Sequence, residues 1–284
     1  DLLRSLREPT PAPFLAAGFL PVATEAPSGA AAGAPTDAAT GAASLAPVPP
    51  VPAAPSGRPD PGRAVLLSLV VAVIATLAGL PVAVALGWVL ARKEFPGRTV
   101  VSTLVLVPLV LPPVVTGFLM LELLSPEAPV GAVLAAVGLP VPFTLLGAIL
   151  AALVVGMPLY VSAIRGAFMA VDPDLEDMAL TLGVRPREAF WRITLPLAAP
   201  GIAAGAILAF ARALGEFGAT VVLAGNMEGE TRTIALAVYT LLEAPGGRGA
   251  VWTLVGASLL LSAAALLGYE VLSRRQRLQR ERGL

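Results

Sequence analysis

The 284-residue chain carries 19 basic and 19 acidic side chains, so its formal net charge is zero, and 56% of its residues are apolar whereas only 13% are charged. Soluble domains contain roughly 45–50% apolar and about 25% charged residues, so this composition excludes an ordinary soluble enzyme, a disordered chain and a basic nucleic-acid-binding protein. Cysteine and histidine are both absent, which excludes disulfides, thiolate nucleophiles and histidine-based metal sites. We therefore expect an all-α, polytopic membrane protein.

The first 62 residues differ in composition from everything that follows. Residues 24–62 contain nine prolines and twelve alanines among 39 residues, with almost no large apolar side chain. Such a segment buries too little apolar surface to offset the entropy of ordering, so we expect a disordered Ala/Pro-rich linker. Residues 1–23 carry some apolar residues but too few for a domain. The N-terminal extension therefore divides into a short segment at 1–23 and a linker at 24–62.

Long apolar runs begin at residue 64, and about 20 mostly apolar residues suffice for one membrane-spanning helix. Five spans are predicted, at 64–91, 99–124, 143–168, 197–223 and 251–272, within a permease domain at 63–275 that precedes a basic tail at 276–284. The apolar stretch 130–139 is short and is interpreted as an interfacial or re-entrant segment. In the loops that follow the first span and in the C-terminal tail, twelve basic residues fall on one side of this topology and two on the other. The positive-inside rule therefore predicts a cytoplasmic C-terminus and an extracytoplasmic N-terminal extension.

The loop between the third and fourth spans, 171–196, has an unusual pattern. Asp172 is a plausible N-cap before Pro173, and Leu175, Met178, Ala179 and Leu182 recur at helical spacing. Gly183 is placed to end this helix in a left-handed conformation, Pro186 can open a second short helix, and Pro196 is expected to interrupt the chain before span four. Two short helices hinged at a glycine suit docking into a groove of another protein. Packing of the loop against its own bundle is the alternative.

At this point the sequence resembles a known family. Glu176, Ala179, Gly183 and the pair Leu195–Pro196 resemble the EAA loop of ABC importer permeases, and the resemblance implies that this loop docks on a cytoplasmic ATPase. The residues expected to couple the chain to that ATPase are Glu176, Ala179, Gly183, Pro186, Leu195 and Pro196. Met178 and Leu180 depart from the family pattern. The only lysine, Lys93, follows no glycine-rich loop, so this chain is expected to bind no cofactor and ATP-Mg is assigned to the partner ATPase.

Three further runs resemble the molybdate-type permease subunit: LVPLVLPPVVTG, which ends at Gly117, LAFARALGEFGATVVLAGN at 208–226, and ETRTIALAVYTLLEAPGG at 230–247. The resemblance implies the fold of a type I ABC importer permease, a homodimer in a bacterial inner membrane and import of molybdate or tungstate. Sulfate or thiosulfate permeases are near relatives and remain an alternative. A gradient-driven secondary transporter is a further alternative, against which the scarcity of acidic residues in the spans counts.

The run DLLRSLREPTPAPFLAAGFLPV at the start resembles the C-terminus of a periplasmic oxyanion-binding protein. Its predicted extracytoplasmic position agrees with this resemblance. We therefore expect an oxyanion-binding protein as a partner, fused upstream through the Ala/Pro-rich linker. An unrelated extension is the alternative.

Two groups of residues inside the spans are candidates for the translocation pathway or its gate. Pro112 and Pro113, with Thr116 and Gly117, lie in span two, where prolines free backbone carbonyls that need partners in protein or in a water-lined cavity. A kinked helix buried in the bundle explains them equally well. Arg212 and Glu216 lie four residues apart on one helical face, and a structural ion pair is the preferred interpretation over a gate. No catalytic residues and no metal site are expected.

Overall fold

The computed structural model describes residues 60–243 and 248–281, and within these ranges the regular secondary structure is entirely helical. The segment predicted at 1–23 and nearly all of the linker predicted at 24–62 lie outside the described residues. The last three residues of that linker begin the first helix, since the Asp60 carboxylate accepts a hydrogen bond from the Gly62 amide and Pro61 occupies the first helical position. At the other end, the last helix continues through the first residues of the basic tail to Glu281.

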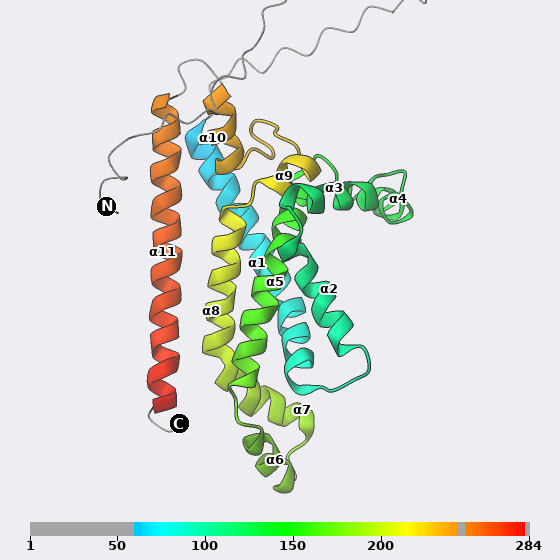
Figure 1. Ribbon diagram of the computed structural model, residues 1–284, viewed down its shortest axis with the longest axis vertical. Helices are drawn as coiled ribbons and strands as arrows, with labels where there is room; N and C mark the ends of the chain where they lie inside the picture. Colours follow the sequence, from blue (N-terminus) through cyan, green and yellow to red (C-terminus); the bar gives the residue numbers. More distant parts are fainter. Residues whose placement is uncertain (1–59, 244–247, 282–284) are drawn as a thin grey trace, which may run out of the picture. The chain divides into compact units, whose positions relative to one another are not determined.

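The longest helices of the described part are α1 (Pro61–Arg92), α5 (Leu145–Met169), α8 (Leu195–Leu214) and α11 (Arg248–Glu281). Four helical segments are long and apolar enough to cross a membrane, and a fifth is obtained if α2 (Arg98–Val110) and α3 (Pro113–Leu124) together form one broken span. This number agrees with the five spans predicted from the sequence. Figure 1 shows α5 between α1 and α8, with α11 running beside α8.

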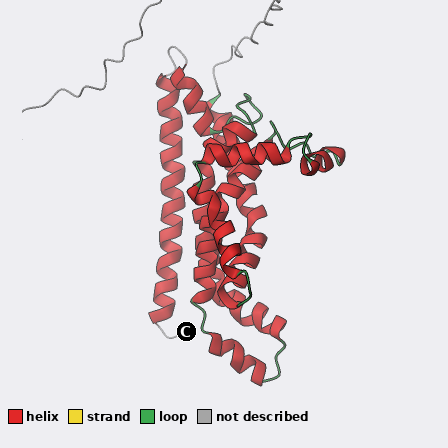
Figure 2. Ribbon diagram, turned by 45° about the vertical axis from the view of Figure 1, so that its right-hand side comes forward, coloured by secondary structure: helices red, strands yellow, loops and turns green. Residues whose placement is uncertain are grey.

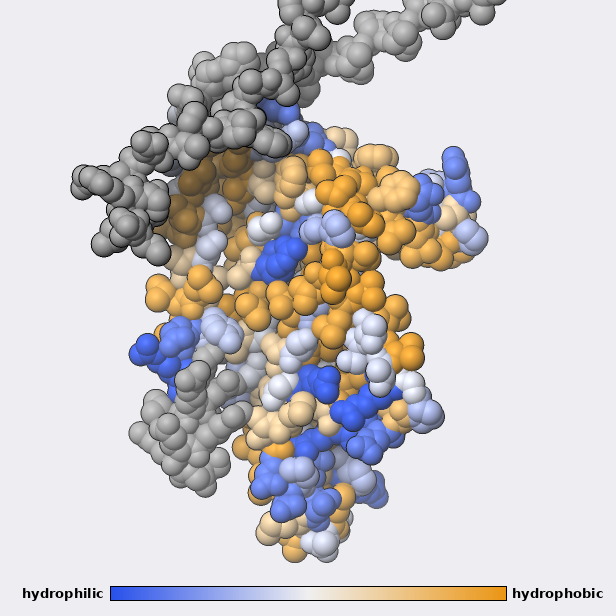
Figure 3. Space-filling model, in the orientation of Figure 1, coloured by the Kyte–Doolittle hydropathy of each residue, from blue (hydrophilic) through white to orange (hydrophobic). Residues whose placement is uncertain are grey.

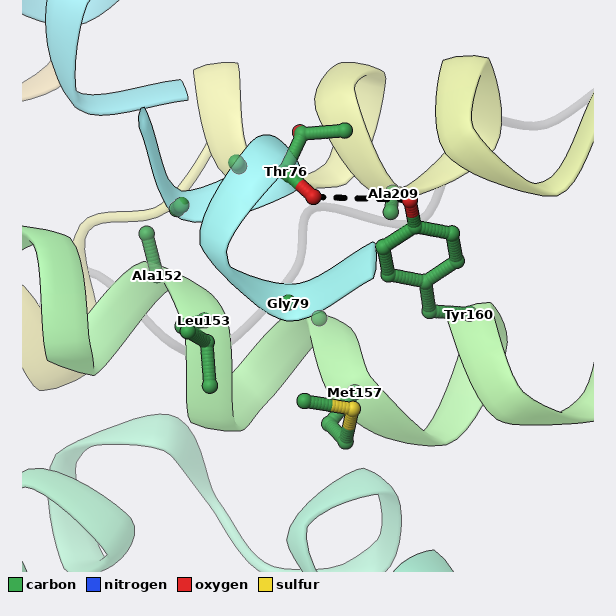
Figure 4. Close-up of a pocket in the computed structure, with 10 residues that line it drawn as sticks. Thr76, Gly79, Ala152, Leu153, Met157, Tyr160 and Ala209 are labelled. Carbon is green, nitrogen blue, oxygen red and sulfur yellow. Dashed lines mark hydrogen bonds between the residues drawn. The ribbon is translucent and has the colours of Figure 1, made fainter. Parts of the chain in front are cut away.

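Small side chains allow α1, α5 and α8 to pack closely. Alanines and glycines from the three helices, among them Gly79, Ala152 and Ala209, surround a cavity of only about 10 Å³ (Figure 4). Beside it the Tyr160 hydroxyl donates to the Thr76 carbonyl over 3.4 Å. Helices in a membrane associate through close van der Waals packing of small residues rather than through a hydrophobic driving force. Small residues thus let the three helices approach closely at this level, and larger buried side chains such as Leu90, Ile164 and Phe168 fill the rest of the core.

The second predicted span, 99–124, is not one helix. Helices α2 and α3 are bent by 115° relative to each other at the break between Val110 and Pro113. Pro112 and Pro113 remove two consecutive amide donors, and both Leu111 and Pro112 adopt extended ψ angles of 139° and 132°. Pro108, in contrast, is accommodated inside α2. The proline kink expected in span two is therefore a complete break, because tandem prolines end a helix that a single proline only perturbs.

The fourth predicted span, 197–223, also ends early. Helix α8 stops at Leu214, with Gly215 as its C-cap, and a separate short helix α9 (Gly218–Leu223) follows. The prediction for the start of α8 is also wrong. Pro196 was expected to interrupt the chain, but the helix runs through it. Helix α7 (Pro186–Ala189) and a π-helical turn, η1 (Phe190–Thr194), continue directly into α8. The π turn, in which Leu195 N donates to Phe190 O, comes directly before Pro196, and the helix continues past this proline without a break.

Five further, shorter helices in the described part of the chain lie around the core. Helix α6 (Pro173–Thr181) and α7 lie together at one end, whereas α9 and α10 (Ile234–Glu243) lie at the other (Figure 1). Helix α4 (Pro129–Ala136), in the stretch interpreted as interfacial or re-entrant, extends away from the long helices beside α3 (Figure 2). Helix α10 was not predicted. Its first amide, that of Ile234, donates to Ser68 Oγ of α1 over 2.7 Å, so a side chain of a distant helix caps it.

Candidate functional site

The loop predicted to dock on a partner forms a defined helical hook built from α6, α7 and η1. Asp172 caps α6 by accepting a hydrogen bond from the Asp174 amide over 3.0 Å, as predicted. The helix ends in a Schellman motif, in which Val184 N donates to Ala179 O and Gly183 N to Leu180 O, both over 3.0 Å. Gly183 has φ = +84°, which confirms the predicted left-handed hinge.

Glu176 anchors this hook to the body of the protein. Its carboxylate accepts a hydrogen bond from Thr194 Oγ1 over 2.6 Å and lies 3.4 Å from Nη2 of Arg92, the last residue of α1. The same guanidinium nitrogen of Arg92 donates to Val171 O over 2.8 Å. Thr194 is fully buried, and only 14% of the Arg92 side chain is exposed. Both ends of the hook are thus tied to one another and to the end of α1, and these bonds are shielded from water.

An aromatic cluster supports the second half of the hook. The Phe190 ring lies 5.4 Å from the Trp88 ring of α1 and 6.2 Å from the Phe168 ring of α5. Such ring pairs add about 0.5–1.5 kcal/mol to the burial of their area. Lys93 Nζ lies 5.4 Å from the centre of the Trp88 ring on the outer side of this cluster. The hook therefore rests on an apolar foundation shared by α1, α5 and η1.

The outer face of the hook is apolar and open. Ala179 turns inward and is 6% exposed, whereas Met178 and Leu182 of the predicted stripe are 63% and 83% exposed. A groove of about 450 Å³ lies on another part of the hook, where Leu180 but neither Met178 nor Leu182 lines it; its lining residues are Trp88, Lys93, Glu176, Leu180, Pro186, Arg187, Ala189, Phe190 and Trp191. Large apolar side chains beside a groove mark a surface for a protein partner. The alternative in which the loop only packs on its own bundle applies to Ala179 but not to these exposed residues.

The predicted pathway residues meet where α3 crosses α9. Gly117 of α3 lies so close to α9 that a Cβ atom at this position would approach Ala219 Cα to 2.7 Å, and a Cβ on Gly218 would approach the Pro113 ring to 2.9 Å. Thr116 is buried at this crossing, and its hydroxyl has no hydrogen-bond partner among the described residues. The structure thus brings together residues of the runs PPVVTG and GEFGAT, which are about 100 positions apart in the printed sequence.

Arg212 and Glu216 form the ion pair expected from their spacing, with 2.7 Å between Nη1 and Oε2. The second carboxylate oxygen of Glu216 accepts a hydrogen bond from the Ala219 amide over 2.9 Å, so the carboxylate also caps the start of α9. Glu216 is buried, whereas about a quarter of the Arg212 side chain is exposed. This geometry is that of a structural ion pair, which links the end of α8 to the helix that crosses α3.

One group of polar residues was missed by the sequence analysis. In the hairpin between α9 and α10, Arg232 Nε donates to Asn226 Oδ1 over 2.9 Å, and its Nη1 lies 3.5 Å from a Glu228 carboxylate oxygen. Asn226 Nδ2 in turn donates to Thr240 of α10 over 2.8 Å. The signal was present in the run ETRT, which the sequence analysis used only as a mark of family resemblance. Within the described residues no group of acidic side chains suits a metal ion.

The two candidate sites lie at opposite ends of the helices, with the hook at the end of α1 and the α3–α9 crossing near the start of α5 (Figure 1). In Figure 3, hydrophobic side chains cover much of the face over α2 and α3, whereas hydrophilic ones gather towards the end formed by α6 and α7. This distribution fits a hook that leaves an apolar layer and enters water. The hook is thus separated from the crossing by the length of the apolar helices.

Comparison with known proteins places these features in context. Residues 83–278 match the family described as binding-protein-dependent transport system inner membrane component. The chain is 46% identical over 213 residues to the molybdenum transport system permease protein ModB of Escherichia coli K12, and 44% identical over 213 residues to ModB of Haemophilus influenzae, in each case covering 75% of this chain and 93% of the relative. It is 31% identical over 202 residues to a probable sulfate transport system permease protein, cysT, of Chlorokybus atmophyticus, covering 71% of this chain and 70% of that protein.

Among solved structures, the fold is similar to that of a bacterial ABC transporter involved in the import of the acidic polysaccharide alginate, with a TM-score of 0.56 at 22% identity over 76% of this chain and 78% of that chain. It is also similar to the MetNI methionine ABC transporter in inward-facing conformations, with a TM-score of 0.56 at 16% identity over 76% of this chain and 94% of that chain. At these identities the likeness is one of fold.

Proposed function

Because the chain belongs to the family of binding-protein-dependent transport system inner membrane components, we propose that it is the permease subunit of an ATP-driven importer of molybdate. Two ModB permeases that match along 93% of their length are 44–46% identical to it, whereas the sulfate permease relative is 31% identical. The higher identity to molybdate permeases carries the substrate assignment. Tungstate has the same tetrahedral geometry and charge as molybdate, so we include it as a substrate.

The observation that carries the proposed mechanism is the double anchoring of Glu176. A partner ATPase, which binds ATP-Mg, docks on the outer face of the hook. Its movement reaches α1 through the Arg92–Glu176 ion pair and α8 through the unbroken helix from Pro186 to Leu214. A rigid connection of this kind transmits a displacement of the hook to two core helices at once. Glu176, Ala179, Gly183, Pro186, Leu195 and Pro196 are thus assigned to coupling.

The crossing of α3 and α9 is proposed to border the translocation pathway. Pro112, Pro113, Thr116 and Gly117 shape one side of it, and the Arg212–Glu216 pair fixes the position of α9 on the other. The chain offers no cluster of arginines and free amides there, which suits a passage that releases its cargo rather than binding it tightly. Selectivity then resides in an oxyanion-binding protein on the opposite side of the membrane from the ATPase.

The assembly proposed for this chain is a homodimer in a bacterial inner membrane, with the hook and the C-terminus in the cytoplasm and the N-terminal extension outside. The twelve-to-two distribution of basic residues supports this orientation. The resemblance of residues 1–23 to the end of an oxyanion-binding protein supports a binding-protein–permease fusion, with the Ala/Pro-rich segment as its linker.

Reconstitution tests the proposed function. The full chain is placed in liposomes with its ATPase subunit and binding protein, and uptake of molybdate, tungstate and sulfate is measured with internal ATP. We expect uptake of molybdate and tungstate that falls to background when either the ATPase or ATP is omitted. Preferential uptake of sulfate would show that the substrate is sulfate and not molybdate. Uptake that an ion gradient drives without the ATPase would contradict the importer mechanism itself.

A further inference from the structure

A polar hollow lies between the start of α2 and the last turns of α5, apart from both candidate sites. Its volume is about 300 Å³, at the lower end of the roughly 300–1,000 Å³ typical of ligand sites. Helix α2 contributes Arg98, Thr99, Ser102 and Thr103, and α5 contributes Arg165. All five lining residues are hydrogen-bond donors, two are cations and none is acidic. The hollow therefore has a positive charge that its own walls do not neutralise.

Five arginines in the described part of the chain form ion pairs with a carboxylate, whereas Arg98 and Arg165 of the hollow, like Arg63, Arg185 and Arg187, form none. Arg92, Arg192, Arg212, Arg232 and Arg274 each lie within 3.5 Å of a carboxylate oxygen. In the ranges that the structure describes, neither Arg98 nor Arg165 has such a carboxylate. Arg98 uses one Nη2 donor for the Leu90 carbonyl over 2.7 Å, and the buried Nε of Arg165 has no partner in the described structure. A guanidinium has five donors, and leaving one buried and unpaired is unfavourable, so an acceptor is missing here.

The hydroxyls and the start of α2, which form the rest of the hollow, offer further hydrogen-bond donors to an acceptor bound there. Thr99, Ser102 and Thr103 are three and four residues apart, so their hydroxyls lie along one face of α2. Thr99 also belongs to the first turn of this 13-residue helix, whose N-cap, Gly97, offers no side chain to its amides. Arginines recognise phosphate-like groups through paired hydrogen bonds, and a helix start adds a partial positive charge. Together these groups match a compact anion with several oxygen atoms.

We propose that the hollow lined by Arg98, Thr99, Ser102, Thr103 and Arg165 binds a tetrahedral oxyanion. Two sources carry this chemistry, a free anion in solution and the phosphate of a membrane lipid, since the hollow lies at the end of the apolar helices where a lipid headgroup is located. Arginines that only set the orientation of the chain in the membrane need to lie near the membrane surface. They need neither a shared hollow nor a row of hydroxyls beside them. The hollow shares no lining residue with the α3–α9 crossing or with the docking groove.

Binding measurements on the purified full chain test this site. Equilibrium dialysis with radiolabelled inorganic phosphate reports a free anion, and native mass spectrometry with phosphatidylglycerol against phosphatidylcholine reports a lipid headgroup. We expect at least one probe to bind and Arg165→Gln to weaken it about tenfold, the loss expected for one charge-assisted contact pair. Arg274→Gln removes the same charge from the exposed Arg274–Glu270 pair of α11 and is the matched control, with a change below about twofold.

Ser102→Ala is a second variant that removes only a hydroxyl, and we expect it to weaken binding by about threefold while leaving the helical content unchanged. Phosphate binding that depends on Arg165 assigns the hollow to a free anion, and selective retention of phosphatidylglycerol assigns it to a lipid. The proposal is overturned if the wild-type chain binds neither probe. It is equally overturned if Arg274→Gln weakens binding as much as Arg165→Gln.

Discussion

At the scale of single residues, the hook depends on contacts made by short polar side chains. The carboxylate of Glu176 joins α6 to Thr194 at the end of η1 and to Arg92 at the end of α1. The sequence predicts that Glu176 matters, because it occupies the position expected in an EAA loop. The sequence does not predict Arg92 as its partner, since an ion pair between distant residues leaves no periodic pattern in the chain.

Gly183 provides a residue-scale test of the hook. Its φ of +84° is unfavourable for any residue with a Cβ atom, by about 1–2 kcal/mol, although a Cβ placed there meets no other atom within 4 Å. We expect Gly183→Ala to lower the amount of substrate transported per ATP hydrolysed, because the strain is relieved by reorienting α6 against α7. Coupled uptake and ATPase assays in proteoliposomes measure this ratio.

Gly166→Ala is the matched control for Gly183→Ala. A Cβ at Gly166 also meets nothing within 4 Å, but this glycine lies inside α5 with an ordinary helical φ. Alanine is favoured over glycine in a helix by about 0.5–1 kcal/mol, so this variant should keep the wild-type ratio. If both variants transport the same amount of substrate per ATP hydrolysed, the left-handed conformation of Gly183 is not needed for coupling.

At the scale of elements, the two broken spans have different local causes, but each continues into a short helix. Helix α3 begins where tandem prolines end α2, and α9 begins where Gly215 ends α8, and the two short helices then pack on each other. Each break alone looks like a local defect in an apolar run. The tertiary structure shows that the short helices after the two breaks pack on each other. Gly117 and Gly218 allow the backbones of α3 and α9 to approach closely.

Substitution of Gly117 tests this crossing. In Gly117→Ala the new Cβ would lie 2.7 Å from Ala219 Cα and 2.8 Å from Ala219 O, both of them backbone atoms that cannot rotate away. Overpacking of this kind costs about 1–3 kcal/mol, so we expect a lower thermal unfolding midpoint and altered uptake. The midpoint is measured on the protein in detergent by circular dichroism.

The control for the crossing is Gly156→Ala in α5. Its Cβ would have one neighbour, Ala209 O, at an ordinary 3.9 Å, so the unfolding midpoint should stay the same or rise slightly. If Gly117→Ala is as stable and as active as Gly156→Ala, the close contact of α3 with α9 does not exist in the membrane.

At the scale of the whole molecule, the proposed orientation predicts that the hook and the region near α4 face opposite sides of the membrane. The chain contains no cysteine, so single cysteines can be introduced without removing native ones. Met178→Cys on the hook and Glu127→Cys near α4 replace exposed side chains on the two proposed sides. A membrane-impermeant maleimide should label Met178→Cys only in inside-out vesicles and Glu127→Cys only in right-side-out vesicles. Labelling of both from the same side would contradict the five-span topology.

The class of the molecule, its long apolar helices and the helical hook with its glycine hinge could all be predicted from the residue pattern. These features depend on hydropathy and backbone preference, which act within a few residues of each other. Only the tertiary structure decided where the spans break, that Arg92 holds Glu176, that α3 rests on α9, and that Arg98 and Arg165 share a hollow. Each of these depends on side chains or backbones brought together from distant positions, and such contacts are set by packing rather than by any local pattern.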